Sequence, residues 1–227
     1  MNAEMTSVER RAAVYAALGD PLRLAVVDAL ALGDRSPGEL GELLGMPSNL
    51  LAHHLRLLEQ AGVIARGRSE ADRRRTYVRL VPSALPGSLE PRMAAPRVVF
   101  VCTHNSARSQ FASALWARRS VVPVASAGTH PVRRVHRRAV SVARRHGFRL
   151  DEVRPANVSD VLRPDDLVVA VCDGAYEELS SATLHWAVAD PVRVDTSAAF
   201  ERAFREIEQR VDRLAGAMET TDARRAT

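Results

Sequence analysis

Cys102 and Arg108 are the residues whose types and spacing point most directly to chemistry. Cys102 follows the hydrophobic segment VVFV, and five residues separate it from Arg108, near the start of a predicted helix. A loop between a strand and a helix can wrap its backbone N–H groups around one tetrahedral oxyanion, and the helix N-terminus adds the positive end of its dipole. The predicted oxyanion-binding loop consists of Thr103, His104, Asn105, Ser106 and Ala107.

This loop could also activate a nucleophile. Arg108 can hold two anion oxygens through its planar guanidinium. The positive field that holds an anion would also stabilise a thiolate at Cys102. Ser109 could hydrogen-bond the sulfur, and the side chain of Asn105 could support the tight loop backbone. We therefore predict that one loop both binds an oxyanion and supplies the group that attacks it.

Two residues later in the chain could complete a reaction. Asp190, which precedes Pro191, could donate a proton to a departing oxygen, although an Asp-Pro pair is also a common turn. Cys172 is the only other cysteine of the chain. It could act as a second, resolving thiol, although a buried strand cysteine without a chemical role fits the same position.

Alternating strands and helices are predicted to position these residues. Short hydrophobic segments predict strands, and longer segments with helical periodicity predict helices between them. The strands are expected at 97–102, 122–128 and 166–172, and the helices at 106–120, 136–148 and 196–218. This βαβ order predicts an α/β domain with a parallel sheet covered by helices.

The first part of the chain has a different pattern. Four helices are expected at 7–18, 19–32, 36–45 and 48–62, followed by a basic hairpin at 63–81. Two helices joined by the short GMP turn and followed by a hairpin are typical of an α+β winged helix-turn-helix, although a solvated charged turn on an ordinary helical domain is the alternative. The predicted DNA contacts are Ser48, Asn49, His53, His54 and Arg56 on the last helix and Arg73, Arg74 and Arg75 in the wing.

The composition of the chain and the positions of its prolines give the domain boundaries. The proline-rich stretch VPSALPGSLEPRMAAP separates the two patterns. We expect a DNA-binding domain at 7–82, a linker at 83–96, a second domain at 97–216 and a flexible tail at 217–227. His53 and His54 are adjacent and diverge by about 100° on a helix, so we predict no metal site there or elsewhere.

Residues 97–216 resemble the low-molecular-weight protein tyrosine phosphatases, and within them the arsenate reductases. The resemblance rests on VCTHNSARS, ASAGTHP and DPVRV. It implies that Cys102 is the nucleophile, Arg108 the oxyanion binder, Ser109 the thiolate stabiliser and Asp190 the general acid. In thioredoxin-coupled reductases a cysteine matching Cys172 is followed seven residues later by a third cysteine. Position 179 is leucine here, so that relay is incomplete.

Residues 8–81 resemble the ArsR-type arsenical-resistance repressors through LGDPLRLAVVDAL, HHLRLLEQAGVI and RRRTYVRL. The resemblance implies that the protein binds double-stranded operator DNA as a homodimer. The arsenite-sensing members bind the metalloid through cysteines, because soft metalloids prefer thiolates. The first 82 residues contain no cysteine, so a site of that kind is absent here. The C-terminal dimer helix of many relatives is replaced by the linker.

Three functions remain open from the sequence. The first is an ArsR-type transcriptional regulator fused to a reductase that converts arsenate to arsenite with an external thiol system (thioredoxin, mycothiol or glutaredoxin) and no bound cofactor. The others are a DNA-tethered phosphatase and a non-catalytic sensor of oxyanions or oxidants. The 227 residues carry a net charge of +5, are 46% hydrophobic and contain two cysteines. No apolar run approaches the roughly 20 residues that span a bilayer, so we expect a cytoplasmic protein without a membrane partner.

Overall fold

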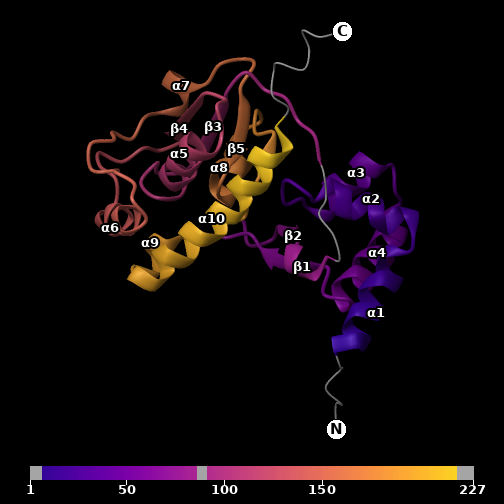
Figure 1. The fold of residues 1–227 in the computed structure, drawn as a ribbon. Helices are drawn as coiled ribbons and strands as arrows, with labels where there is room; N and C mark the ends of the chain where they lie inside the picture. The colour runs from indigo at the N-terminus through magenta and orange to yellow at the C-terminus, as the bar shows by residue number, and fades with distance from the viewer. Residues whose placement is uncertain (1–6, 86–90, 219–227) are drawn as a thin grey trace, which may run out of the picture. The chain divides into compact units, whose positions relative to one another are not determined.

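The computed structural model describes residues 7–85 and 91–218 (Figure 1). Part of the predicted linker, residues 86–90, and residues 219–227 of the predicted tail lie outside the described residues. The chain divides into two compact units. Unit 1 comprises the residues up to Ser69 together with Arg73–Pro91, and unit 2 comprises Glu70–Asp72 together with the residues from Arg92 onward.

Unit 1 is a winged helix-turn-helix, as predicted. Its last two helices form the helix-turn-helix, and its strands pair antiparallel, with Ile64 opposite Leu80. Leu40, Leu51, Leu55 and Leu58 are almost fully buried between the helices. The elements are α1 (Ser7–Leu18), α2 (Pro21–Ala29), α3 (Pro37–Leu44), α4 (Ser48–Gln60), β1 (Ile64–Arg68), β2 (Thr76–Leu80) and the 3₁₀ turn η1 (Pro82–Ala84).

Local sequence signals set the helix boundaries of unit 1. Asp20 caps α2 by accepting hydrogen bonds from the N–H groups of Leu22 and Arg23 at 2.9 and 3.0 Å. Ser36 and Glu39 form a reciprocal capping box at the start of α3. Gly45 ends α3 with a φ of 60°, a left-handed conformation that glycine adopts without steric cost. The turn before α4 is therefore tightly defined.

Unit 2 is an α/β domain with a parallel sheet, which confirms the predicted fold class. The four strands lie in the order β4-β3-β5-β6, and the three neighbouring pairs are all parallel. The strands are β3 (Val98–Cys102), β4 (Val124–Gly128), β5 (Leu167–Ala170) and β6 (Leu184–His185). The helices are α5 (Arg108–Arg119), α6 (Arg137–Arg145), α7 (Val158–Val161), α8 (Asp173–Glu178), α9 (Pro191–Val194) and α10 (Ser197–Ala217).

Aromatic side chains fill the core of unit 2. Phe100 of the central strand lies between Trp116 and Trp186, with ring centroids 5.9 and 5.6 Å away. Phe111 of α5 contacts Phe204 of α10 edge-on at 5.3 Å, and α10 packs against both α5 and α6 (Figure 1). This core holds β3 and α5 rigidly, and the loop between them therefore starts and ends on fixed supports.

The starts of β3 and β5 are joined by an ion pair. Arg97 binds Asp166 through two parallel hydrogen bonds of 2.8 and 2.6 Å, and the Asp166 side chain is only 2% exposed. The hydrogen bond from Arg97 lowers the pKa of Asp166 below its usual value, against the opposing effect of burial. The pair therefore stabilises the sheet in its charged form.

We expect Asp166→Asn to lower the free energy of unfolding by about 2 to 3 kcal/mol, because Arg97 loses its partner. The folded-state pKa of Asp166 is depressed, so its contribution is present above the unfolded value of about 3.9 and is lost as pH falls further. Urea denaturation at pH 7 and pH 3 should show the difference shrinking at the lower pH. Asp165→Asn, at the neighbouring exposed carboxylate, is the matched control. An equal loss in both variants would contradict the assignment.

The short elements of unit 2 were not predicted. Strand β6 and helices α7, α8 and α9 span only two to six residues, too few for hydrophobic periodicity to be recognised. No helix in the described ranges is both long and apolar enough to cross a membrane.

Candidate active site and DNA-reading helix

The candidate active site lies where the parallel strands of unit 2 end. Cys102 is the last residue of β3 and is paired in register with Gly128, the last residue of β4. On the other side, the N–H of Val171 donates to the carbonyl of Val101 at 2.7 Å, directly before Cys172. The carboxyl ends of parallel strands share one edge of a sheet, so the two cysteines, far apart in sequence, reach the same edge.

The carbonyl groups of the predicted oxyanion-binding loop are bonded to the segment outside it. The carbonyls of Cys102, Thr103, His104 and Ser106 accept from backbone N–H groups of the segment 129–136, at 2.7 to 3.2 Å. Among the described residues, the backbone N–H groups of His104, Ser106, Ala107 and Arg108 have no acceptor. Unpaired N–H groups in a largely buried loop are costly unless an anion or water accepts from them. This arrangement is that of an anion cradle.

Asn105 holds the loop in shape. Its φ of 50° is in the left-handed region, which asparagine tolerates better than most residues. Its side-chain amide donates to Ser109 Oγ at 2.8 Å and accepts from the N–H of Ala156 at 3.0 Å. Its carbonyl accepts from Gln110 at 3.1 Å. Every polar group of this buried residue therefore serves the loop.

Cys102 lies at the floor of the loop and is 2% exposed. Its Sγ is 3.1 Å from Ser109 Oγ and accepts from the N–H of Asn105 at 3.2 Å. Both groups can donate a hydrogen bond to the sulfur. The geometry therefore suits the sequence-based expectation of an attacking thiolate.

Arg108 is the buried cation of the site. Its Nη1 donates to the carbonyl of Val188 at 2.9 Å, and its Nη2 lies 3.2 Å from the Asp190 carboxylate. Burial alone would lower the pKa of the guanidinium, but the charges of Cys172, Cys102 and Asp190 outweigh it and raise the pKa. Arg108 therefore stays charged, between both sulfurs and the candidate acid.

Asp190 reaches the site from a distant loop. Its Oδ1 caps α9 by accepting from the N–H of Val192 at 3.1 Å, and its Oδ2 faces Arg108. Asp190 is thus the N-cap of α9 and also faces the buried guanidinium. Its role as a proton donor remains a prediction.

Cys172 contributes the second sulfur. It is 2% exposed and lies 3.5 Å from Thr103 Oγ1, and it accepts from the N–H of Ala175 at 3.4 Å. Cys172, Thr103 and Arg108 line the same pocket. Burial raises the pKa of the Cys172 thiol, partly offset by Arg108. Cys172 lies two residues beyond the end of β5. It is buried and lines the same pocket as Arg108.

In unit 1, α4 presents most of the predicted DNA contacts. Ser48, Asn49, His53 and Arg56 are exposed, and so are Arg73, Arg74 and Arg75 in the turn between β1 and β2. Their contact with DNA remains a prediction. His54 is the one member of the predicted set that is not exposed.

His54 was expected on the DNA-facing side of α4, and this prediction was wrong. The residue is only 5% exposed, and its Nδ1 lies 3.8 Å from Asp20, the cap of α2. His54 follows Leu51 by three positions and precedes Leu58 by four, so it shares the buried face of the helix. Polarity suggested an outward side chain, whereas helical spacing places it inside.

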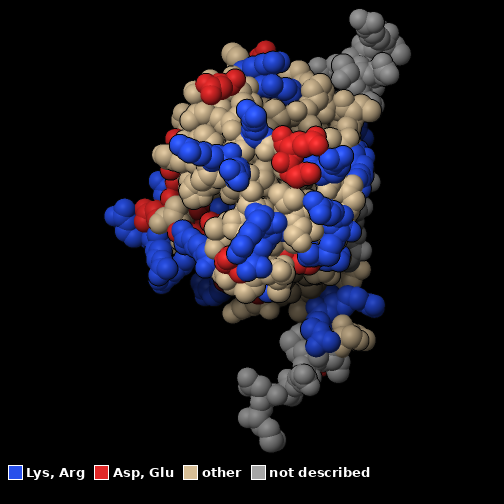
Figure 2. Space-filling view, turned by 90° about the vertical axis from the view of Figure 1, so that its left-hand side faces the viewer, with Lys and Arg blue, Asp and Glu red and all other residues tan. Residues whose placement is uncertain are grey.

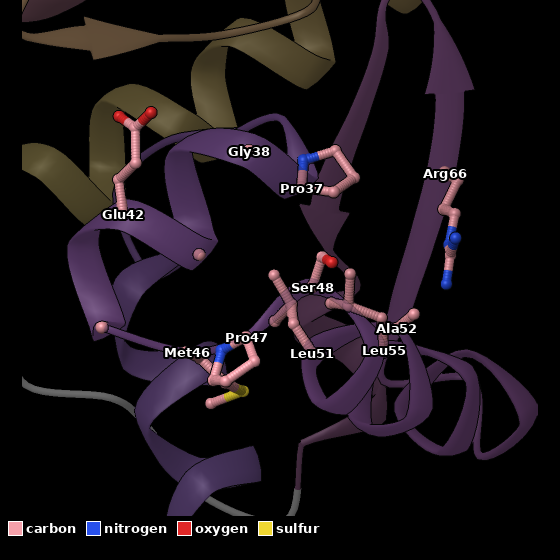
Figure 3. Close-up of a pocket in the computed structure, with 12 residues that line it drawn as sticks. Pro37, Gly38, Glu42, Met46, Pro47, Ser48, Leu51, Ala52, Leu55 and Arg66 are labelled. Carbon is pink, nitrogen blue, oxygen red and sulfur yellow. The ribbon is translucent and has the colours of Figure 1, made fainter.

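A cavity of about 570 Å³ lies beside the first turn of α4 (Figure 3). Met46, Leu51 and Leu55 supply apolar surface to it, and Ser48 and Ala52 of α4 also line it. Arg66 of β1 borders it and forms an ion pair with Glu59 at 3.1 Å. The exposed start of α4 is therefore next to a hollow in the protein surface.

Comparison with known proteins agrees with both geometries. Residues 97–224 match the model of the low molecular weight phosphotyrosine protein phosphatases, over more than half of the chain. The chain belongs to this family. Residues 18–66 match the model of a helix-turn-helix domain. A helix-turn-helix DNA-binding domain is thus fused to a domain similar to the arsenate reductases and low-molecular-weight phosphatases.

Individual relatives match one of the two domains each. The chain is 30% identical to an arsenate reductase of Bacillus licheniformis over 141 residues, which is 54% of this chain and 97% of that protein. It is 36% identical to the transcriptional repressor SdpR of Bacillus subtilis over 52 residues, 23% of this chain and 58% of that protein. The crystal structure of an arsenate reductase from Archaeoglobus fulgidus is 31% identical, with a TM-score of 0.46, and the match covers 52% of this chain and 98% of that one.

The phosphatase-family domain holds two site features that sequence reasoning missed. Asp173 and His185 are buried and joined by a 2.9 Å hydrogen bond, and Tyr176 stacks on the histidine at 4.2 Å. Burial would raise the pKa of Asp173, but the hydrogen bond from His185 and the charge of Arg108 lower it overall. Eleven residues separate the two, and they belong to no sequence motif that would have indicated the pair.

Gly128 is the second feature. A Cβ at this position would lie 2.9 Å from the carbonyl oxygen of Thr103 and 3.0 Å from the backbone nitrogen of Asn105. Only glycine lets the end of β4 approach the anion loop this closely. The segment ASAGTHP includes this glycine, but the sequence does not show why glycine is required there. The pairing of β4 with β3 shows it.

Proposed function

We propose that the protein is an ArsR-type transcriptional regulator fused to a thiol-dependent arsenate reductase. The observation that carries the proposal is the buried loop around Cys102, whose unpaired N–H groups and Arg108 form a cradle for one tetrahedral oxyanion. The similarity to an arsenate reductase over nearly its whole length supports arsenate as that anion. Unit 1 would bind double-stranded operator DNA, as a homodimer.

The chemistry follows from the positions of the two sulfurs. The Cys102 thiolate attacks the arsenic of arsenate, so an S–As bond forms, an As–O bond breaks, and the oxygen leaves as water with a proton from Asp190. A second thiolate then attacks Cys102 Sγ. An S–S bond forms, the electron pair of the S–As bond stays on arsenic, and arsenite is released. Two thiols are oxidised for each As(V) reduced to As(III).

The second thiol is either Cys172 or an external one. Cys172 and Cys102 lie at the same edge of the sheet, and the hydroxyl of Thr103, the residue after Cys102, lies 3.5 Å from the Cys172 sulfur. We propose that Cys172 forms the disulfide and that an external system (thioredoxin, mycothiol or glutaredoxin) reduces it.

Cys172→Ser separates these routes. If Cys172 resolves the adduct, multiple turnover with thioredoxin is expected to fall by about 100-fold or more, whereas one arsenate should still bind at Cys102. Mass spectrometry after oxidation should show a Cys102–Cys172 disulfide in the wild type only. Undiminished turnover with a small thiol would instead assign the second step to that thiol.

The function itself is tested by measuring arsenite release from arsenate with thioredoxin, glutaredoxin and mycothiol systems in parallel with aryl phosphate hydrolysis. Arsenite release with at least one system is the expected result. Hydrolysis of aryl phosphate without arsenite release would make the domain a phosphatase, which the same cradle could serve since phosphate has the same shape and charge. Absence of both activities would leave a sensor of oxyanions and overturn the proposal.

A further inference from the structure

The positive charge of the chain is concentrated in residues 91–150, which lie outside the helix-turn-helix. Residues 91–150 contain twelve arginines and no aspartate or glutamate. Unit 1 contains eleven arginines and nine acidic residues, so its net charge is only +2. Catalysis in unit 2 uses one of the twelve arginines, Arg108. The others call for a separate explanation.

Helix α6 and the segments directly before and after it contain seven of these arginines. The helix buries Ala139, Val142 and Ala143 and packs that side on α10. Its opposite side faces solvent. Figure 2 views the side of unit 2 that carries α6 in Figure 1, where several groups of basic side chains, in blue, stand among uncharged surface with a few acidic residues. The seven are Arg133, Arg134, Arg137, Arg138, Arg144, Arg145 and Arg149.

Three of the seven are neutralised locally. Arg138 pairs with Asp195 at 2.7 Å, Arg145 with Glu201 at 3.0 Å and Arg149 with Glu152 at 2.8 Å. The first two pairs join α6 to Asp195, just after α9, and to α10, whereas the third lies within the loop after α6. They leave little charge for a partner.

The remaining four form what we call the α6 basic face: Arg133, Arg134, Arg137 and Arg144. All four are exposed, and none forms an ion pair with any residue in the described ranges. Arg137 contributes to lowering the pKa of Asp195, whose main partner is Arg138. Like charges placed close together repel, and an anionic partner relieves this repulsion.

We propose that the α6 basic face is a second, sequence-independent contact to double-stranded DNA. Guanidinium groups on a helix surface match phosphate oxygens, and releasing counterions from DNA drives such binding. Because the face shares a chain with a helix-turn-helix, its contact becomes intramolecular once unit 1 is bound, which raises its effective concentration. The face would add phosphate attraction to that of unit 1, whose net charge is only +2.

The chemistry of the face favours DNA over a lipid surface. A helix that lies in a membrane interface buries large apolar side chains such as Trp, Phe or Leu beside its basic residues. The apolar side of α6 consists of small residues and is already buried. Its solvent side offers arginine and Ser141, so only the charges are available to a partner.

The test uses the full chain with all four residues changed: Arg133→Gln, Arg134→Gln, Arg137→Gln and Arg144→Gln. Affinity for a random-sequence DNA duplex is measured by fluorescence anisotropy between 50 and 200 mM NaCl. Each phosphate contact contributes about 0.9 to the slope of log K against log salt. We expect the slope to become less steep by about 2 or more, and affinity at 100 mM to fall roughly tenfold or more.

A second variant carries the same charge change elsewhere on unit 2, at the exposed residues Arg154, Arg163, Arg202 and Arg205. It should keep most of the affinity and slope, with both variants melting as the wild type does. Equal losses in the two variants would reduce the effect to net charge and overturn the proposal. Unchanged DNA binding in the α6 variant would also overturn it, as would loss confined to phosphatidylserine vesicles, which would assign the face to lipid.

Discussion

Cys102→Ser is expected to abolish arsenite release, with turnover falling by roughly 10⁴-fold or more. The hydroxyl that replaces the thiol is not ionised at neutral pH and cannot form the S–As bond. The sulfur position is held by Ser109 and by the N–H of Asn105, and neither can act as a nucleophile in its place. Arsenite formation with thioredoxin, followed over hours, measures the residual rate.

The same variant should still bind the anion. The backbone N–H groups of the loop and Arg108 are unchanged, so arsenate affinity measured by calorimetry is expected within about tenfold of the wild type. Loss of turnover with retained binding assigns Cys102 to chemistry rather than to folding or affinity. Measurable multiple turnover in Cys102→Ser would show that the attacking group is elsewhere.

Arg108→Lys is expected to lower turnover by about 100- to 1,000-fold, the usual cost of removing one donor to a developing oxyanion. Lysine keeps the positive charge but is a point donor. It cannot reach the Val188 carbonyl and the Asp190 carboxylate together while also holding two anion oxygens. The loss therefore tests geometry, because the charge is conserved.

Arg118→Lys is the matched control on the same helix. Arg118 donates to the carbonyl of Gly147 and stacks on Phe148, away from the loop, so its replacement should leave turnover unchanged. Thermal unfolding of both variants excludes a general loss of fold. If Arg108→Lys retained more than about half of the wild-type rate, bidentate binding would play no part in the reaction.

The local parts of the candidate site were predictable because they are short in sequence. The strand before Cys102, the loop and the start of α5 lie within about twelve consecutive residues. Hydrophobicity of β3 and the spacing of Cys102, Asn105 and Arg108 were enough to predict an anion loop between a strand and a helix. The wing and its arginines were predictable for the same reason, because a hairpin pairs neighbouring residues.

The long-range parts were decided by packing. The pairing of β5 with β3 brings Cys172 to the edge of the sheet where β3 ends at Cys102. The two cysteines are about seventy positions apart in sequence. The fold also joins Asp173 to His185 and turns His54 inward toward Asp20. Polarity alone had placed His54 outside, because a single residue type does not reveal which face of a helix is covered.

The sequence by itself determined that a cysteine and an arginine share a loop between a strand and a helix and that a helix-turn-helix is present, since each depends on contiguous residues. Only the tertiary structure decided which groups share the site and which arginines remain unpaired. Arg138 and Arg145 meet Asp195 and Glu201 across more than fifty residues, whereas Arg137 and Arg144 beside them form no ion pair in the described ranges. The physical reason is that ion pairing depends on distances of a few ångströms in space, which the order of residues does not encode directly.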